Sequence, residues 1–538
     1  MSRSPKLTKT DSSLSLRTRK SNQDFRVLVA ESVGRKAGSP LAMDEQSYHS
    51  GTEVVPEENQ GLLNQVIEMG IDEEQWSPSK TKSSFKRPLF SVNNLLKGLI
   101  LIFVLGCFIV ATKVVVSELD DVLVKRDTMY YNGSTYFDST VIYISLDGFR
   151  NDYLDRKVTP NIDLLAEQGI RAEYMNPSFP SITFPNHWTL VTGLYPESHG
   201  IVANEFFDPT LRQEFIHKNA TISGEPKWWG GEPIWVTSKK QGKKSAVIMW
   251  PGSNVPIDSI EPDYYVPYTR TTTAIDKMDL ALNWLDLPIE ERPQSISIYI
   301  PQIDQKGHGG GPDGKQLNSV LSDMDDAIGH LMKGLTTRNL DSHVHLVVVS
   351  DHGMAATDKS RLIFYDHILS KESESFLRDR EAWPLLGLRP KQDAPDYALD
   401  QVYNEIQQYV QQNQPVPFQV FKRNEMPARF HYDATDRIAP ILIIPDVGYS
   451  IIRSTDYDPN SGLDYRPRGI HGYDNLALEM RAIFTARGPQ VEKRYSAGTV
   501  VEPFFNTEMY RFLTILLDVE AAPNNSTLNG VFKVQQEK

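Results

Sequence analysis

The sequence of 538 residues contains a single cysteine, Cys107, so no disulfide can form within the chain. One thiol also excludes a zinc site built from several cysteines, which leaves His, Asp and Glu as protein ligands for such an ion. Basic charge is scarce too, because 56 Lys and Arg residues stand against 69 Asp and Glu, a net charge of −13. Proteins that bind nucleic-acid polymers are usually basic, so the composition argues against such a partner. An anionic small molecule can still bind if metal ions supply positive charge.

Aromatic residues and sustained hydrophobic periodicity are rare in the first 95 residues. This segment is rich in Ser, Lys, Arg, Glu and Gln, a composition typical of disordered chain. We therefore predict a disordered cytoplasmic tail over residues 1–95. Within it, Glu58–Leu63 (ENQGLL) resembles an acidic dileucine sorting signal, although patterns this short also occur by chance.

One long uncharged run follows this segment, GLILIFVLGCFIVAT at 98–112. At about 1.5 Å per residue, residues 97–116 are long enough for a transmembrane helix. The long chain before the run disfavours a cleaved signal peptide, and the flanking charges disfavour a buried core helix. Lys and Arg residues precede the run and mainly acidic residues follow it, which predicts a cytoplasmic N-terminus.

N-glycosylation sequons agree with this orientation, since all of them follow the predicted span: Asn132, Asn219, Asn524 and Asn525. The sequence thus predicts a single-pass type II membrane glycoprotein, with a stalk at 117–139 and a large extracellular or luminal part. The cell surface and a vacuole both remain open as its location.

From residue 140 onward, apolar strand-like segments alternate with helix-like segments. The expected strands lie at 141–148, 246–250, 295–300 and 345–353, and amphipathic helices are expected at 272–287 and 316–335. This alternation predicts an α/β fold with a mostly parallel sheet flanked by helices on both faces. We assign residues 140–520 to this domain and residues 521–538 to a C-terminal tail.

Three aspartates follow apolar strands, at the edge where open α/β sheets bind their ligands: Asp147, Asp304 and Asp351. A single aspartate there is more often a turn or helix-cap residue. Histidines accompany these aspartates, because His308 lies four residues after Asp304 and His352 adjoins Asp351. His471 lies in a Gly-Ile-His-Gly segment. Together the pattern predicts a metal centre.

Thr183 lies at the start of an amphipathic segment, within PSITFPNH at 180–187. A threonine in this place is usually the N-cap of a helix. The alternative is a nucleophilic hydroxyl, with the amides of the helix N-terminus receiving a phosphoryl oxygen. The residue types alone leave both interpretations open.

Six sequence blocks resemble the ectonucleotide pyrophosphatase/phosphodiesterase family of the alkaline phosphatase superfamily. In chain order they are ISLDGFR (144–150), TFPNHWTLVTGLYPESHG (183–200), GEPIWVT (231–237), DQKGHGGGP (304–312), VVVSDHGM (347–354) and GIHGYDN (469–475). The resemblance covers residues 140–520. It implies an alkaline-phosphatase-like fold and a phosphodiesterase or nucleotide pyrophosphatase activity.

The resemblance also implies two zinc ions per chain. One ion would be held by Asp147, Thr183, Asp351 and His352, and the other by Asp304, His308 and His471. His187 and His199 belong to the same blocks but match no ligand position, so we interpret them as structural.

Substrate contacts follow from the same resemblance. Asn204 matches the family asparagine that hydrogen-bonds a non-bridging phosphate oxygen, and Phe184 and Tyr268 match the two faces of an aromatic slot for a base. The implied reaction is a double displacement. Thr183 attacks phosphorus to form a phosphothreonine ester, and water then releases a nucleoside 5′-monophosphate from a nucleoside triphosphate or dinucleotide.

The chain departs from the family pattern in its polyphosphate contacts. Ile182, Glu205 and Gly230 occupy positions where nucleotide-hydrolysing animal members have lysines. The chain also contains no somatomedin-like or nuclease-like domain and resembles the compact fungal branch. Two other functions stay open, a hydrolase of phospholipid or glycerol phosphodiesters and a catalytically inactive receptor. The aromatic slot disfavours the first, and the intact nucleophile and ligand positions disfavour the second.

Overall fold

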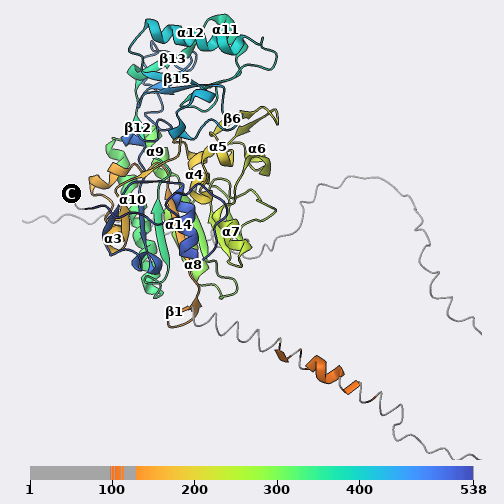
Figure 1. Cartoon of the computed structure of the whole chain (residues 1–538). Helices are drawn as coiled ribbons and strands as arrows, with labels where there is room; N and C mark the ends of the chain where they lie inside the picture. The colour runs from red at the N-terminus through yellow and green to blue at the C-terminus, as the bar shows by residue number, and fades with distance from the viewer. Residues whose placement is uncertain are drawn as a thin grey trace, which may run out of the picture. The chain divides into compact units, whose positions relative to one another are not determined.

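The computed structural model describes residues 129–536 and, before them, separate positions of a helical segment between Lys97 and Lys113 (Figure 1). Among these described residues, no helix has both the length and the apolar character needed to cross a membrane. The predicted tail at 1–95, the rest of the predicted span and the first part of the predicted stalk lie outside the described residues.

An eight-stranded sheet forms the centre of the folded domain, in the order β20-β4-β19-β11-β3-β10-β8-β9. Its strands are β3 (Val141–Leu146), β4 (Ile170–Ala172), β8 (Ser245–Ile248), β9 (Tyr264–Val266), β10 (Ser295–Ile300), β11 (His345–Val349), β19 (Phe484–Arg487) and β20 (Thr499–Val501). The five strands from β11 to β9 run parallel, whereas β19 runs antiparallel to β11 and β4. The predicted α/β fold is confirmed, and the sheet is mixed because of β19.

The central strands are apolar along their whole length because both of their faces are covered. Every residue of β3, β10 and β11 is buried. Helix α10 (Lys315–Thr337) packs beside α3 (Pro160–Gln168) and α8 (Ala274–Leu285), while α14 (Glu508–Leu517) packs beside α4 (Thr183–Thr192) and α7 (Ile234–Lys240). Helices α8 and α10 occupy the two predicted helical segments.

The part of the chain that follows β12 (Ala355–Ala356) and precedes β18 (Gly469–Ile470) forms a smaller layer with its own core (Figure 1). It contains a three-stranded sheet and two longer helical segments: β14 (Leu386–Leu388), β15 (Phe418–Lys422), β16 (Ile441–Pro445), α11 (Lys371–Phe376) and α12 (Ala398–Gln412). Because β12 pairs with β18, the chain returns from this layer to the place where it left the main domain. This return brings His471 toward the ends of the central strands.

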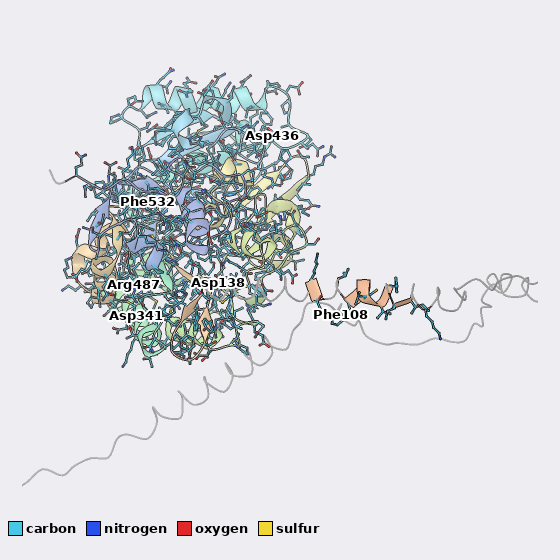
Figure 2. All side chains as sticks on the ribbon, turned by 60° about the horizontal axis from the view of Figure 1, so that its bottom comes forward. Phe108, Asp138, Asp341, Asp436, Arg487 and Phe532 are labelled. Carbon is cyan, nitrogen blue, oxygen red and sulfur yellow. The ribbon has the colours of Figure 1, made fainter. Side chains whose placement is uncertain are left out.

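The folded domain extends beyond the predicted boundaries at 140 and 520. Near its start, β1 (Tyr130–Tyr131) pairs with β2 (Tyr136–Phe137), and Phe137 is buried under the guanidinium of Arg292. Near its end, Phe532 is buried against Phe484, Phe504 and Phe512. Figure 2 labels Phe532 within the folded domain. Residues 129–139 and 521–536 therefore belong to the folded domain and are not a stalk and a tail. Local sequence does not reveal this, because their apolar residues contact segments that are distant in the chain.

Candidate active site

Three adjacent parallel strands place most of the candidate ligands at one sheet edge. Asp147 follows β3 directly, and Asp351 and His352 follow β11. Asp304 and His308 lie one turn apart on α9 (Gln302–Gly310), the helix that follows β10. The backbone amide of Asp304 donates to the carbonyl of Asp147 at 3.0 Å, which joins two of these strand ends. The structure thus places these residues together at the carboxyl edge of the sheet.

Thr183 reaches the same place from α4. It is the first residue of that helix, and the N-cap residue is Ile182, which makes no side-chain cap hydrogen bond. The interpretation of Thr183 as an N-cap therefore does not hold. Its Oγ1 lies 3.2 Å from His352 Nε2 instead, so the hydroxyl faces the candidate ligands.

One group of donor atoms surrounds His352. Its Nε2 lies 3.0 Å from Asp351 Oδ2, 3.2 Å from Thr183 Oγ1 and 3.5 Å from Asp147 Oδ1. Two ligand atoms on a tetrahedral zinc ion, each about 2.0 Å from it, lie about 3.3 Å apart. The observed separations match that spacing.

A second group forms a nearly equilateral triangle. Asp304 Oδ1 lies 3.3 Å from His308 Nε2 and 3.4 Å from His471 Nε2, and the two Nε2 atoms are 3.3 Å apart. Three donors at this spacing form one face of a tetrahedron and leave a fourth position for another ligand. Donor atoms of Asp304, His352 and His471 also lie within 4.8 Å of one another, so the two groups adjoin at His352.

All three histidines in these groups are oriented in the same way. Each Nδ1 lies close to a backbone carbonyl oxygen, at 2.7 Å for His308 with Gly469, 2.8 Å for His352 with Gly353 and 2.8 Å for His471 with Ser181. A carbonyl can only accept, so each Nδ1 carries the proton. The Nε2 lone pairs can then face the shared centre, the arrangement that metal-binding histidines usually show.

Three carboxylates crowd the buried site. Asp147 Oδ1, Asp304 Oδ1 and Asp351 Oδ2 are buried and have no hydrogen-bond donor in favourable geometry among the described residues. Burial, together with repulsion from Asp351 and Asp304, raises the pKa of Asp147 well above its usual value. Buried charge without a partner is costly, and a bound cation would remove that cost. The residues present therefore fit a metal centre.

The electrostatic environment differs between the histidines. Burial lowers the pKa of His471 to about 3, and the neighbouring His352 adds to this effect. Burial also acts on His308, but the Asp304 carboxylate outweighs it and raises the pKa of His308 to about 9. A cation placed between these side chains would compete with the proton on His308, so metal binding here would release that proton.

Asn204 and Phe184 lie beside the nucleophile. Asn204 Oδ1 accepts a hydrogen bond from the backbone amide of Phe184 at 3.1 Å, which leaves its Nδ2 group available as a donor. The half-buried Phe184 ring contacts the edge of His217 at a centroid distance of 5.1 Å. Tyr268 is 48% exposed, and its hydroxyl accepts from Gln305, the residue after Asp304. Phe184 and Tyr268 have no ring contact with each other among the described residues.

Tyr299 and His187 contact the candidate ligands, and these contacts were not predicted from the sequence. The Tyr299 hydroxyl donates to Asp147 Oδ2, and His187 Nδ1 lies 3.2 Å from Asp351 Oδ2. Tyr299 pairs in register with Ser145, which lies two residues before Asp147. A tyrosine near the end of a central strand was therefore a signal in the sequence that could have placed Tyr299 at the site. By contrast, His199 interacts with Thr189 and Ile201.

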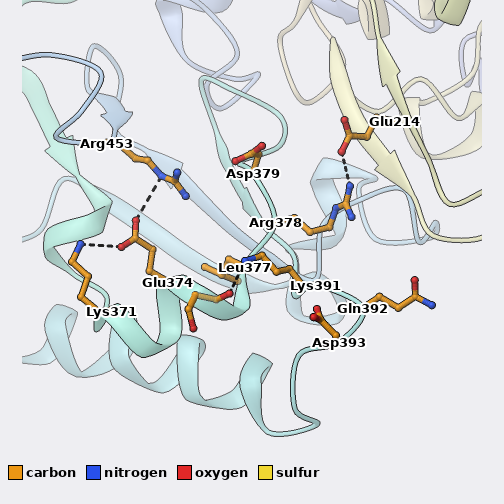
Figure 3. A pocket seen from close by; sticks show the side chains of 11 residues that line it. Glu214, Lys371, Glu374, Leu377, Arg378, Asp379, Lys391, Gln392, Asp393 and Arg453 are labelled. Carbon is orange, nitrogen blue, oxygen red and sulfur yellow. Dashed lines mark hydrogen bonds and ion pairs between the residues drawn. The ribbon is translucent and has the colours of Figure 1, made fainter.

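A separate surface cavity lies over the smaller layer (Figure 3). Charged side chains of both signs line it, and several form ion pairs with one another, such as Arg378 with Glu214 and Lys371 with Glu374. No predicted site residue lines this cavity. Its internally paired charges favour no particular ligand.

Comparison with known proteins relates this arrangement to a family. The sequence model of type I phosphodiesterase/nucleotide pyrophosphatase matches residues 141–474. An uncharacterized pyrophosphatase/phosphodiesterase of Schizosaccharomyces pombe is 44% identical over 412 residues, which are 76% of this chain and 83% of that protein. Human ectonucleotide pyrophosphatase/phosphodiesterase family member 1 is 35% identical over 73% of this chain, which spans only 42% of the human protein.

A solved structure is also similar to this chain. Murine ectonucleotide pyrophosphatase/phosphodiesterase 5, an inactive threonine-to-alanine variant in complex with AMP, matches with a TM-score of 0.65 and 34% sequence identity. The match covers 73% of this chain and 98% of the murine one.

Proposed function

The chain belongs to the ectonucleotide pyrophosphatase/phosphodiesterase family of the alkaline phosphatase superfamily and is a hydrolase of that family, and we propose that it cuts nucleoside triphosphates and dinucleotides to nucleoside 5′-monophosphates. The observation that carries this proposal is the position of Thr183 Oγ1, 3.2 Å from His352 Nε2, the atom that also lies near the buried carboxylates of Asp147 and Asp351. A hydroxyl at a metal centre is suited to nucleophilic attack on phosphorus.

The donor groups fit two zinc ions. We assign Asp147, Thr183, Asp351 and His352 to one ion, and Asp304, His308 and His471 to the other. When bound, the ions would supply Lewis-acid stabilisation of the charge on the phosphoryl group.

Thr183 and Asn204 carry out the remaining chemistry. Thr183 Oγ1 forms a bond to phosphorus as the bond to the leaving oxygen breaks, the hydroxyl proton passes to solvent, and the rest of the substrate departs with the leaving oxygen. Water then breaks the phosphothreonine Oγ1–P bond, which releases the monoester and restores the hydroxyl. Asn204 is oriented through its Oδ1 contact with Phe184 N, so its Nδ2 can donate to a non-bridging phosphate oxygen.

A nucleotide substrate is supported by the aromatic residues at the rim and by the AMP bound to the murine relative. Base stacking on aromatic side chains is worth roughly 1–3 kcal/mol per base. Tyr268→Ala is therefore expected to raise the KM for nucleotides by about 5- to 150-fold, at 1.4 kcal/mol per factor of ten. The effect should fall on KM because a base far from phosphorus is held equally in the ground and transition states.

The matched control for Tyr268→Ala is a substrate without a base, bis-p-nitrophenyl phosphate, whose hydrolysis should change little. Steady-state kinetics on both substrates gives the comparison. Equal losses on the two substrates would show that Tyr268 only supports the structure, and a phospholipid or glycerol diester would then replace the nucleotide as the favoured substrate.

We also propose the type II orientation, with residues 1–95 cytoplasmic and the catalytic domain extracellular or luminal. In that case Asn219 should carry a glycan, because it is exposed and uses only its Oδ1 in the described hydrogen bonds. Asn132 and Asn524 instead engage their Nδ2 atoms with backbone carbonyls at 2.8 Å. Asn219→Gln should increase gel mobility by one glycan, measured with and without endoglycosidase.

Protease protection of an N-terminal tag provides the second readout. The tag should be digested only after the membranes are permeabilised. Digestion on intact cells, or a wild-type protein whose mobility does not respond to the endoglycosidase, would contradict this orientation.

A further inference from the structure

His187 connects the nucleophile, a candidate metal ligand and the central sheet. It lies one helical turn after Thr183 on α4, and its side chain is fully buried. Its Nδ1 lies 2.9 Å from the Thr183 carbonyl oxygen and 3.2 Å from Asp351 Oδ2. Its Nε2 lies 2.9 Å from Ser145 Oγ, two residues before Asp147 on β3.

The partners of this ring determine where its proton lies. The Thr183 carbonyl and the Asp351 carboxylate can only accept, so Nδ1 carries a proton. The Ser145 hydroxyl can then donate to Nε2, which satisfies both ring nitrogens. The Nδ1–H is directed to the Thr183 carbonyl, and the Asp351 oxygen lies beside the same polar edge of the ring.

Surrounding aromatic residues hold the ring in this orientation. Tyr299 and Trp250 contact it edge-on, at centroid distances of 4.8 and 5.2 Å. Trp250 Nε1 also donates to the His187 carbonyl oxygen at 3.0 Å, and the Tyr299 hydroxyl donates to Asp147. An apolar side chain would fill this interior position without the cost of burying polar atoms, so packing alone does not account for a histidine with three polar contacts.

We propose that His187 is a positioning residue that sets the placement of Thr183 relative to Asp351. Its contact with Ser145 ties the first turn of α4 to β3, and its polar edge lies beside the Asp351 oxygen that faces His352. This inference rests on the proposed function, because it assigns Asp351 as a metal ligand and Thr183 as the nucleophile. Groups that orient metal ligands typically affect metal affinity or activity by about 10- to 100-fold.

The test compares three variants of the full-length protein. His187→Leu removes all three polar contacts at similar volume, His187→Asn retains an N–H near the Nδ1 position, and Ser145→Ala removes only the Nε2 partner. The matched control is His199→Leu, which changes another fully buried histidine of the same region that interacts with Thr189 and Ile201. For each variant, zinc affinity is measured by chelator competition, folding by thermal melting, and kcat and KM on a nucleotide substrate.

His187→Leu should weaken the affinity for one of the two zinc ions by about 10- to 100-fold and lower kcat by a similar factor, with KM unchanged. His187→Asn should recover most of both losses, and Ser145→Ala should show a smaller loss of the same kind. His199→Leu should alter melting only. A folded His187→Leu with wild-type zinc affinity and kcat would overturn the proposal.

If His187→Leu does not fold, Ser145→Ala decides. Wild-type zinc affinity and kcat in Ser145→Ala would then overturn the proposal. Failure of the proposed function can be told apart from failure of the His187 proposal. A wild-type protein that does not hydrolyse nucleotides would contradict the proposed function, whereas the zinc affinities of the variants would still test the role of His187.

Discussion

Thr183→Ala is expected to lose almost all phosphodiester turnover, by at least about 10³-fold, while the protein still folds and binds zinc. The magnitude follows from the removal of nucleophiles in other hydrolases, where binding and charge stabilisation leave only a small residual rate. Metal should be retained because three ligands remain at that ion, Asp147, Asp351 and His352, and three protein ligands are usual at catalytic zinc sites. Turnover and metal content are measured on the same preparation.

Two further variants make this test specific. Thr183→Ser restores a hydroxyl and should return part of the rate. Thr189→Ala removes a hydroxyl from the same helix, where it contacts His199, and should leave the rate unchanged. Mass spectrometry after acid quenching should find a phosphate ester on Thr183 in the active protein. Wild-type turnover in Thr183→Ala would exclude the covalent mechanism.

Removal of the metal ions is expected to abolish turnover and to destabilise the fold. Asp147, Asp304 and Asp351 would then share a buried site in which His308 pairs with Asp304 alone, and burial and repulsion already raise the pKa of Asp147. A ligand at 100 times its dissociation constant stabilises a protein by about 2.7 kcal/mol, so chelation should lower the free energy of unfolding by at least about that amount. Metal content, melting temperature and turnover are measured before and after chelation.

Adding one metal at a time to the chelated protein identifies the ion that supports turnover. The donors are imidazole nitrogens and carboxylate oxygens, a set suited to zinc, so Zn²⁺ should restore turnover where Mg²⁺ does not. Asp304→Asn should lower the zinc content from two ions to one, because it alters only the group with His308 and His471. A chelated protein that keeps its turnover would show that the reaction needs no metal.

Much of the central fold follows from local sequence. Strands β3, β10 and β11 are recognisable because both faces of a central parallel strand are buried, which requires an uninterrupted apolar run. Helix α8 is recognisable from its amphipathic pattern, and Thr273 and Asp276 form a capping box at its start. The association of Asp147, Asp304 and Asp351 also follows from sequence, since adjacent parallel strands end at one edge.

Other parts of the fold depend on contacts between distant segments. The reversed direction of β19 is set by its pairing with β4 and β11, and four residues of local sequence do not specify direction. The inclusion of residues 521–536 depends on a few aromatic contacts, such as those of Phe532 with Phe484 and Phe504. Tertiary contacts of this kind outweigh the polar composition of the segment.

The sequence by itself determined the residue types of the site and the strand ends that bring most of them together. Only the tertiary structure decided how the rings of His308 and His471 are turned. The Nδ1 of His471 is held by the carbonyl of Ser181, and the Nδ1 of His308 by that of Gly469. These partners are distant in the chain, so neither residue spacing nor side-chain type reveals them. The orientation of a ring depends on the carbonyl that the folded backbone places beside it, and that orientation makes each Nε2 available to a metal ion.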